Sequence, residues 1–128
     1  MIGSTRRVRV FAYGQPCDMR KGFEGLSGLV REQLGRDVLS GELFLFVSRR
    51  RVRAKVLHWD GTGLCLYAKR LENRGRFACL WRDSPGRTVE LSLTELQLFL
   101  EGSDLVGRVT LSPSAVSEAQ LFSNIGVL

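Results

Sequence analysis

Residues 51–59 alternate between charged and apolar side chains more clearly than any other part of the chain. In a strand over this range, one side is apolar and the other cationic, with Val52, Ala54 and Val56 on the first and Arg51, Arg53 and Lys55 on the second. The turn sequence Asp60-Gly61-Thr62-Gly63 follows, and residues 63–71 are again typical of a strand. The pattern predicts an antiparallel hairpin that buries one face.

Other segments predict the rest of the fold. Further strands are expected at residues 6–13, 43–47, 76–82 and 88–91. Asp18 is a typical helix N-cap, and apolar side chains at helical spacing continue from it to about Leu34. Ser92 and Glu95 form a capping box, which opens a second helix that ends near Gly102. We therefore expect an α+β fold: a single domain with a curved antiparallel sheet of about five or six strands and two packed helices.

The length of the chain, 128 residues, is that of one ordinary domain. We expect this domain at residues 1–105, followed by a divergent C-terminal tail at 106–128 that is either disordered or packed on a partner. The longest apolar run, residues 43–47, is far shorter than the about 18 residues that cross a membrane. Three cysteines without a CxxC pair, and no apolar leader, indicate a cytoplasmic protein with reduced thiols.

Positive charge is concentrated in the first two-thirds of the chain. The chain carries 19 basic and 13 acidic residues; 18 of the basic and 8 of the acidic residues lie in residues 1–87, and residues 88–128 are net acidic. Arginine supplies 16 of the basic residues. Because the guanidinium group pairs bidentately with phosphate and stacks on bases, this composition favours a nucleic-acid partner, most simply DNA. The alternative is the general preference of a GC-rich genome for arginine over lysine.

The cations gather around the predicted hairpin, together with two aromatic side chains. If strands 51–59 and 63–71 pair, a cationic stripe lies on one sheet face, with Trp59 on that face and Lys69 and Tyr67 expected near it. The alternative is an ordinary solvated face, with Leu57 and Trp59 covered by a helix. The candidate nucleic-acid-binding residues are Arg20, Lys21, Arg49, Arg50, Arg51, Arg53, Lys55, Trp59, Tyr67, Lys69, Arg70, Arg74 and Arg76.

No catalytic or metal-binding pattern accompanies these cations. His58, the single histidine, is in phase with the apolar side of its strand and is expected in the core. Cys17, Cys65 and Cys79 lack the close spacing of zinc ligands. We therefore expect a non-enzymatic protein with no metal and no cofactor. A metal-dependent nuclease built on Asp18 and Asp60 is the weaker alternative.

Several sequence blocks occur in a characteristic order. They are Asp18-Met19-Arg20-Lys21-Gly22-Phe23 with Gly25-Leu26, Leu43-Phe44-Leu45-Phe46, Lys55 with Leu57, Trp59-Asp60-Gly61 with Gly63, Lys69-Arg70-Leu71-Glu72, Gly75-Arg76-Phe77, and Leu100-Glu101-Gly102 with Asp104. Over roughly residues 8–105, the chain thereby resembles the TnpB-type (second-reading-frame) accessory protein of the bacterial insertion-sequence family numbered sixty-six.

The resemblance implies a protein that assists transposition beside a separate, larger transposase that carries out the strand chemistry. We expect a non-enzymatic accessory factor that binds DNA or the transposase–DNA complex through its basic sheet face. The alternative is a protein-interaction module, which docks on the transposase through helix 92–102 or residues 103–128 without touching DNA. Residues 6–13 are expected to form an edge strand, so pairing with a second copy in a homo-oligomer is a further alternative.

Overall fold

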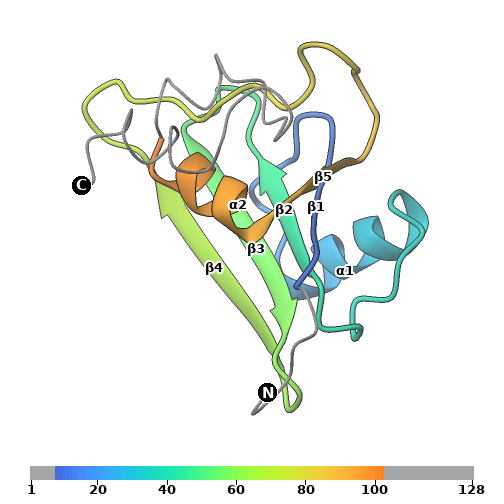
Figure 1. Ribbon diagram of the computed structural model, residues 1–128. Coiled ribbons are helices and arrows are strands. Elements are labelled where there is room, and N and C mark those ends of the chain that lie inside the picture. Colours follow the sequence, from blue (N-terminus) through green and yellow to red (C-terminus); the bar gives the residue numbers. More distant parts are fainter. Residues whose placement is uncertain (1–7, 103–128) are drawn as a thin grey trace.

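The computed structural model describes residues 8–102, which form one layer of sheet between two helices (Figure 1). The predicted tail at 106–128 lies outside the described residues. In chain order the elements are β1 (Val10–Ala12), α1 (Phe23–Glu32), β2 (Leu43–Val47), β3 (Arg53–Trp59), β4 (Leu64–Arg70), β5 (Val89–Leu91) and α2 (Leu93–Leu100). The five strands form one open sheet in the order β4-β3-β2-β1-β5, so the predicted α+β class is confirmed.

The sheet is mixed, whereas the sequence pattern predicted an antiparallel one. Val10 pairs with Leu43 and Ala12 with Leu45 in a parallel ladder, while every other pair of neighbouring strands is antiparallel. The reason is that α1 lies in the connection between β1 and β2 and carries the chain back to the starting end of the sheet. β1 also lies between β2 and β5, so the prediction of an edge strand there was wrong.

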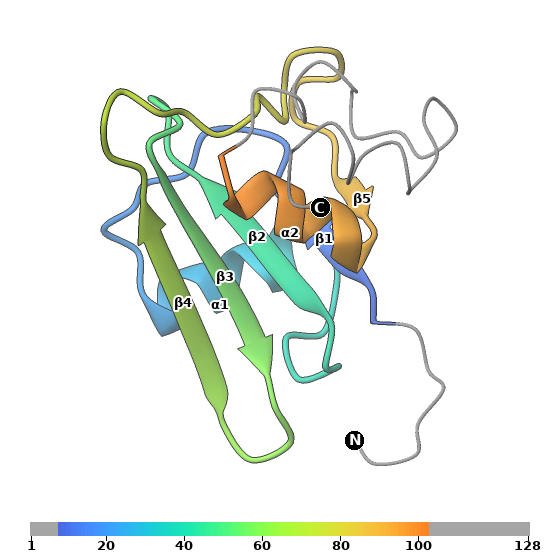
Figure 2. The ribbon, with the colours of Figure 1, turned by 60° about the vertical axis from the view of Figure 1, so that its left-hand side comes forward.

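The two faces of the sheet have separate hydrophobic cores. On one face, Phe44, Phe46 and Leu57 pack with Leu26 and Val30 of α1. The other face carries the side chains that alternate with these along the same strands. They pack against α2 and the segment that follows β4, and they include Leu45, Val47, Val56, Phe77, Leu80 and Phe99. Figure 2 shows α1 and α2 on opposite faces. We call these the α1 face and the α2 face.

Residues 76–82 do not form the strand that their sequence predicted. Phe77, Ala78 and Leu80 are buried, and the Phe77 ring stacks on Phe99 of α2 with a centroid distance of 5.1 Å. Neighbouring side chains that all enter the core do not fit the alternation of a strand. This segment covers the α2 face as an irregular loop.

The helix starts differ in how well the sequence predicted them. The capping box of α2 is confirmed: the Ser92 side chain accepts a hydrogen bond from the Glu95 N–H, and the Glu95 carboxylate accepts one from the Ser92 N–H. α1, in contrast, begins at Phe23 with Gly22 as N-cap, so the prediction that Asp18 caps it was wrong. Within residues 8–102, no helix has the length and apolar character needed to cross a membrane.

Candidate nucleic-acid interface

The β3–β4 hairpin places two arginines directly opposite each other on the α1 face. Arg53 of β3 pairs in register with Arg70 of β4, and both side chains are exposed. Like charges at opposed positions destabilise a sheet by a fraction of a kilocalorie per mole. Arg70 is partly neutralised by an ion pair with Glu72 at 2.9 Å. Arg53 has no side-chain partner within residues 8–102, so its guanidinium fork is available to an anion.

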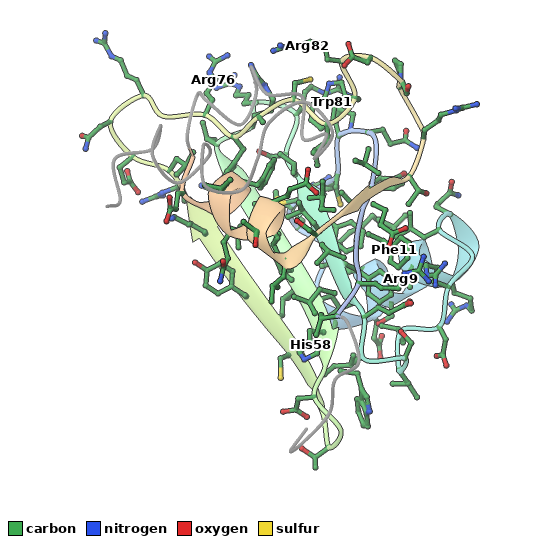
Figure 3. All side chains as sticks on the ribbon, viewed as in Figure 1. Arg9, Phe11, His58, Arg76, Trp81 and Arg82 are labelled. Atoms are coloured by element: carbon green, nitrogen blue, oxygen red, sulfur yellow. The ribbon has the colours of Figure 1, made fainter. Side chains whose placement is uncertain are left out.

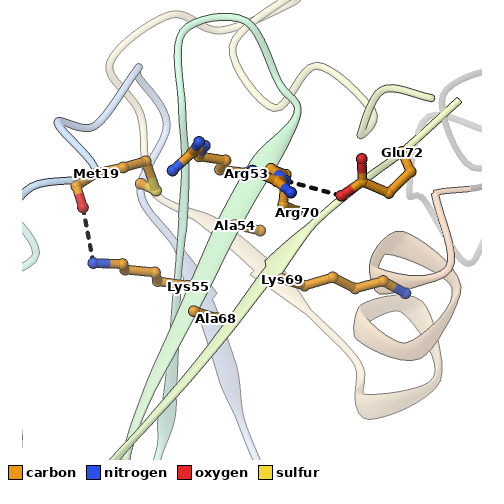
Figure 4. A pocket seen from close by; sticks show the side chains of 8 residues that line it. All are labelled: Met19, Arg53, Ala54, Lys55, Ala68, Lys69, Arg70 and Glu72. Carbon is orange, nitrogen blue, oxygen red and sulfur yellow. Dashed lines mark hydrogen bonds and ion pairs between the residues drawn. The ribbon is translucent and has the colours of Figure 1, made fainter. Parts of the chain in front are cut away.

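These two arginines line an open pocket of about 430 Å³ (Figure 4). Ala68 contributes a small side chain to the α1 face at this point, and longer side chains surround it. Ala54 also lines the pocket, although its side chain is buried on the α2 face. The full lining is Met19, Arg53, Ala54, Lys55, Ala68, Lys69, Arg70 and Glu72. With two guanidinium groups and one carboxylate around a shallow floor, the pocket is electrostatically suited to a phosphate group.

Lys55 lies on the same face but its ammonium group is already engaged. Its Nζ donates to the backbone carbonyls of Met19 and Lys21, both at 2.8 Å. These contacts attach the loop before α1 to the sheet. Lys55 therefore has the geometry of a loop anchor, whereas its position in the basic stripe of the sequence had indicated a phosphate contact.

Lys69 and Tyr67 lie on the α2 face, opposite to the cationic face near which their sequence positions predicted them. In the β3–β4 register, Lys69 pairs with the core residue Ala54, and its Nζ donates to the Leu100 carbonyl at 2.6 Å. Figure 4 shows Lys55 and Lys69 leaving the hairpin toward opposite sides.

Trp59, the other aromatic candidate, pairs with Leu64 on the α1 face and is half-buried. The two aromatic candidates therefore do not share one stacking surface.

Arg51 belongs to a turn rather than to a strand. Its φ is 61°, in the left-handed region, its carbonyl accepts from the Phe77 N–H, and its Nη1 donates to the Phe77 carbonyl at 3.0 Å. The stripe of Arg51, Arg53 and Lys55 expected from the sequence is thus reduced to Arg53 as an exposed cation without a partner in the described part of the chain.

The bonds of Arg51 bring together two loops that carry the remaining candidates. A further bond, from the Leu71 N–H to the Val52 carbonyl at 2.8 Å, joins the same loops. All four candidates there are exposed, and their side chains have no partner within residues 8–102: Arg49 and Arg50 before β3, and Arg74 and Arg76 after β4. We call these four residues the cationic rim.

Sequence reasoning missed Arg82, which is also exposed at this end of the molecule. Figure 3 shows Arg76 and Arg82 at the same end of the sheet. Arg82 was overlooked because it lies in a segment predicted as a strand, six residues beyond the basic cluster. The available signal was its charge, because arginine side chains are mostly exposed in folded proteins.

Arg20 and Lys21 lie in the loop that Lys55 anchors. Arg20 is 92% exposed and its guanidinium group binds the Asp18 carboxylate at 2.8 Å. Hydrogen bonds from the Arg20 side chain and backbone lower the pKa of Asp18 to about 2. Lys21 is exposed. The ion pair with Arg20 therefore explains the low pKa of the Asp18 carboxylate without a bound metal.

Asp60, the other carboxylate of the nuclease alternative, closes the β3–β4 turn. Its Oδ1 accepts from the N–H groups of Thr62 and Gly63, both at 2.9 Å, and these bonds lower its pKa to about 2. Across residues 8–102, no group of three or more His, Cys, Asp or Glu side chains is arranged to hold a metal ion. His58 is half-buried on the α2 face, in phase with Ala54 and Val56.

The sequence blocks that occur in the characteristic order contact one another across the fold. Lys55 binds the Met19 and Lys21 carbonyls, and Lys69 binds the Leu100 carbonyl. Leu71 packs so closely on Gly102 that a Cβ there would lie 2.8 Å from its Cδ1. The family model described as IS66 Orf2 like protein matches residues 8–109. The chain belongs to this family.

Two relatives of the IS66 Orf2-like chain are proteins of Sinorhizobium fredii (strain NBRC 101917 / NGR234). One, named "Uncharacterized protein y4hO", is 39% identical over 104 residues, which cover 81% of this chain and 88% of the relative. The other, "Uncharacterized protein y4jC", is 35% identical over 104 residues, 81% of this chain and 86% of the relative. No solved structure matches the chain. The family supports an accessory role in the transposition of an insertion sequence.

Proposed function

We propose that this IS66 Orf2-like protein is a non-enzymatic accessory factor of transposition that binds DNA at the loop end of its sheet. The observation that carries the proposal is the grouping of exposed cations without partners in the described residues: the cationic rim from two loops, and Arg53 in the adjoining pocket. Family membership supports the accessory role and the association with a transposase.

The hydrogen bonds that each cation already makes within the protein decide which part of the surface is available to DNA. Lys55, Lys69 and Arg51 donate to backbone carbonyls, so binding phosphate would cost them those bonds. The rim arginines lose only water when they meet a phosphate, and guanidinium–phosphate pairs are among the strong hydrogen bonds in proteins. The proposed interface is therefore the rim with the Arg53 pocket, instead of the whole sheet face.

The test is fluorescence anisotropy of labelled duplex DNA titrated with the full-length protein at several salt concentrations. We expect the logarithm of the binding constant to fall linearly with the logarithm of salt, with a slope of about 0.9 per phosphate contact. Arg50→Glu and Arg76→Glu, one from each loop, should each lower the slope by about one.

Arg31→Glu on α1 is the matched control, because it makes the same change in net charge at an exposed position outside the rim. If it weakens binding as much as the rim variants do, only the net charge matters and the interface is not at the rim. Duplexes from the element's own ends, compared with unrelated duplexes, measure sequence preference in the same titration.

An absence of binding at low salt would favour the second candidate, a module that docks on the transposase without touching DNA. Co-purification with the transposase after nuclease treatment would then locate the accessory role in a protein contact. Magnesium-dependent nicking of plasmid DNA by the purified protein would contradict the non-enzymatic proposal directly.

A further inference from the structure

The outer edge of β4 is open within the described part of the chain. Among residues 8–102, β4 is the terminal strand of the sheet and pairs only with β3, and Figures 1 and 2 both show it at the border of the sheet. At one end of the β3–β4 ladder, the Leu71 N–H donates to the Val52 carbonyl, and at the other end the Asp60 N–H donates to the Gly63 carbonyl. Because bonded pairs alternate along an antiparallel ladder, Cys65, Tyr67 and Lys69 direct their backbone groups to β3. Leu64, Leu66, Ala68 and Arg70 direct theirs outward.

Over residues 64–68, this edge lacks the features that keep strands from pairing with other chains. Its seven residues continue one unbroken register with β3, without a bulge, and contain no proline. The first five, residues 64–68, carry no charge. Tyr67 is 51% exposed and Ala68 is also exposed, while Lys69 is turned toward α2. Open edges of this kind are templates for strand addition.

We propose that the edge pairs with β4 of a second copy of this chain, antiparallel and centred on Tyr67. In this register all seven residues find a partner: Leu66 opposes Ala68 of the other copy, Cys65 opposes Lys69, and Leu64 opposes Arg70. Tyr67 opposes Tyr67 at a non-hydrogen-bonded pair, where opposed side chains are closest.

The distribution of charge along β4 favours a second copy in this register. Both cations are at the C-terminal end of the strand, so antiparallel pairing places each against an uncharged residue of the other copy. A register shifted to centre on Lys69 would oppose two lysines and pair fewer residues, and like charges at opposed positions are destabilising. The sequence of β4 is thus self-complementary. The contact uses no residue of the cationic rim, but Arg70 also lines the Arg53 pocket. The association is therefore tested on the protein alone, without DNA.

Analytical ultracentrifugation of the full-length protein over a range of concentrations tests the association. We expect a monomer–dimer equilibrium in the wild type, and a monomer for Tyr67→Lys because two lysines would face each other at the two-fold axis. Leu39→Lys is the matched control: Leu39 is a similarly exposed apolar residue, at 52%, outside β4. It should leave the dimer intact.

Cross-linking tests the register. In a Cys65→Ser background, Tyr67→Cys places two thiols at a pair whose Cα atoms lie about 4.5 Å apart, within reach of a disulfide. We expect this variant to form a covalent dimer under mild oxidation. The wild type should not, because Cys65 opposes Lys69 and lies four positions along the ladder from Cys65 of the other copy.

A wild type that stays monomeric at every concentration overturns the proposal, as does a dimer that survives Tyr67→Lys. If the monomer instead captures an extended transposase segment in a Tyr67-dependent way, the edge serves the transposase and the second copy is the wrong occupant.

Discussion

Lys55 and Arg53 are two residues apart on the same face of β3, yet their surroundings give them different roles. The Lys55 ammonium group donates to two carbonyls of the loop before α1, at 2.8 Å each. The Arg53 guanidinium group is exposed and finds no acceptor among residues 8–102. Removal of the Lys55 ammonium group should lower the free energy of unfolding, whereas removal of the Arg53 guanidinium group should affect only ligand binding at the surface.

Lys55→Met keeps most of the side-chain volume but leaves the Met19 and Lys21 carbonyls without their donor. We expect a loss of about 2 kcal/mol in the free energy of unfolding, because hydrogen bonds to a charged group are worth more than neutral ones. Arg53→Met on the same face should stay within about 0.5 kcal/mol of the wild type. Urea unfolding followed by tryptophan fluorescence measures both, and equal effects would mean that Lys55 does not anchor the loop.

Asp60 makes the stability of the β3–β4 turn depend on acid pH. Its pKa is about 2 in the folded chain, below the about 3.9 of an unfolded chain, so its contribution is complete above about pH 4 and is lost as pH falls through 2. Asp60→Asn keeps an oxygen acceptor without the charge. We expect the wild type to exceed this variant in stability by more at pH 5 than at pH 2.

Urea unfolding at the two pH values measures that difference. Asp83→Asn, at an exposed carboxylate with no side-chain partner within residues 8–102, is the control and should change little at either pH. A difference between wild type and Asp60→Asn that does not change with pH would contradict the assigned cause of the pKa shift.

At the scale of elements, α2 depends on the polar residues at its two ends. The capping box satisfies N–H groups at its start, and Lys69 from β4 donates to the Leu100 carbonyl at its end. A cation at this end also interacts favourably with the helix dipole. Between the ends, Leu96, Leu98 and Phe99 are buried on the α2 face of the sheet. The helix thus combines a locally encoded start with an end supplied by a distant strand.

Ser92→Ala should cost about 1 kcal/mol of stability, because the Glu95 N–H loses its acceptor at the start of α2. Ser92→Asp should recover most of that loss, since aspartate is an equally good N-cap. Gln97→Ala, an exposed change in the same helix, should remain within about 0.5 kcal/mol of the wild type. Chemical denaturation measures the free energy of unfolding of the three variants. A Ser92→Ala variant as stable as Gln97→Ala would contradict the role of the cap.

At the scale of the whole molecule, the loop after β1 supports the long connection that leads to β5. The Gly86 N–H donates to the Gly14 carbonyl at 2.7 Å. A Cβ on Gly14 would lie 2.7 Å from the carbonyl carbon of Arg87 and closer still to its oxygen. Since these are backbone atoms, they have no side-chain rotamer by which to move aside.

Gly14→Ala should therefore destabilise the protein by roughly 3 kcal/mol, near the upper end of ordinary single substitutions. Gly22→Ala is the matched control, because a Cβ at Gly22 meets nothing within 4 Å. Thermal unfolding compares the two variants. Equal midpoints would show that the 84–87 loop can shift without cost.

The sequence by itself determined the features that depend on neighbouring residues. The alternation of β3, the turn at Asp60 and the capping box at Ser92 were confirmed because each follows from side-chain periodicity or from hydrogen bonds within three residues. The order of the sequence blocks indicated the family for the same reason: it can be read along the chain without knowing which residues touch.

Only the tertiary structure decided which cations are free to bind a ligand. The carbonyls that engage Lys55, Lys69 and Arg51 lie 26 to 36 residues away in the chain, and no local pattern reveals them. The parallel pairing of β1 likewise depends on where α1 carries the chain, and β4 is a terminal strand among the described residues because β5 pairs with β1. The sequence therefore located the basic region, and the long-range contacts selected the few side chains within it that remain available.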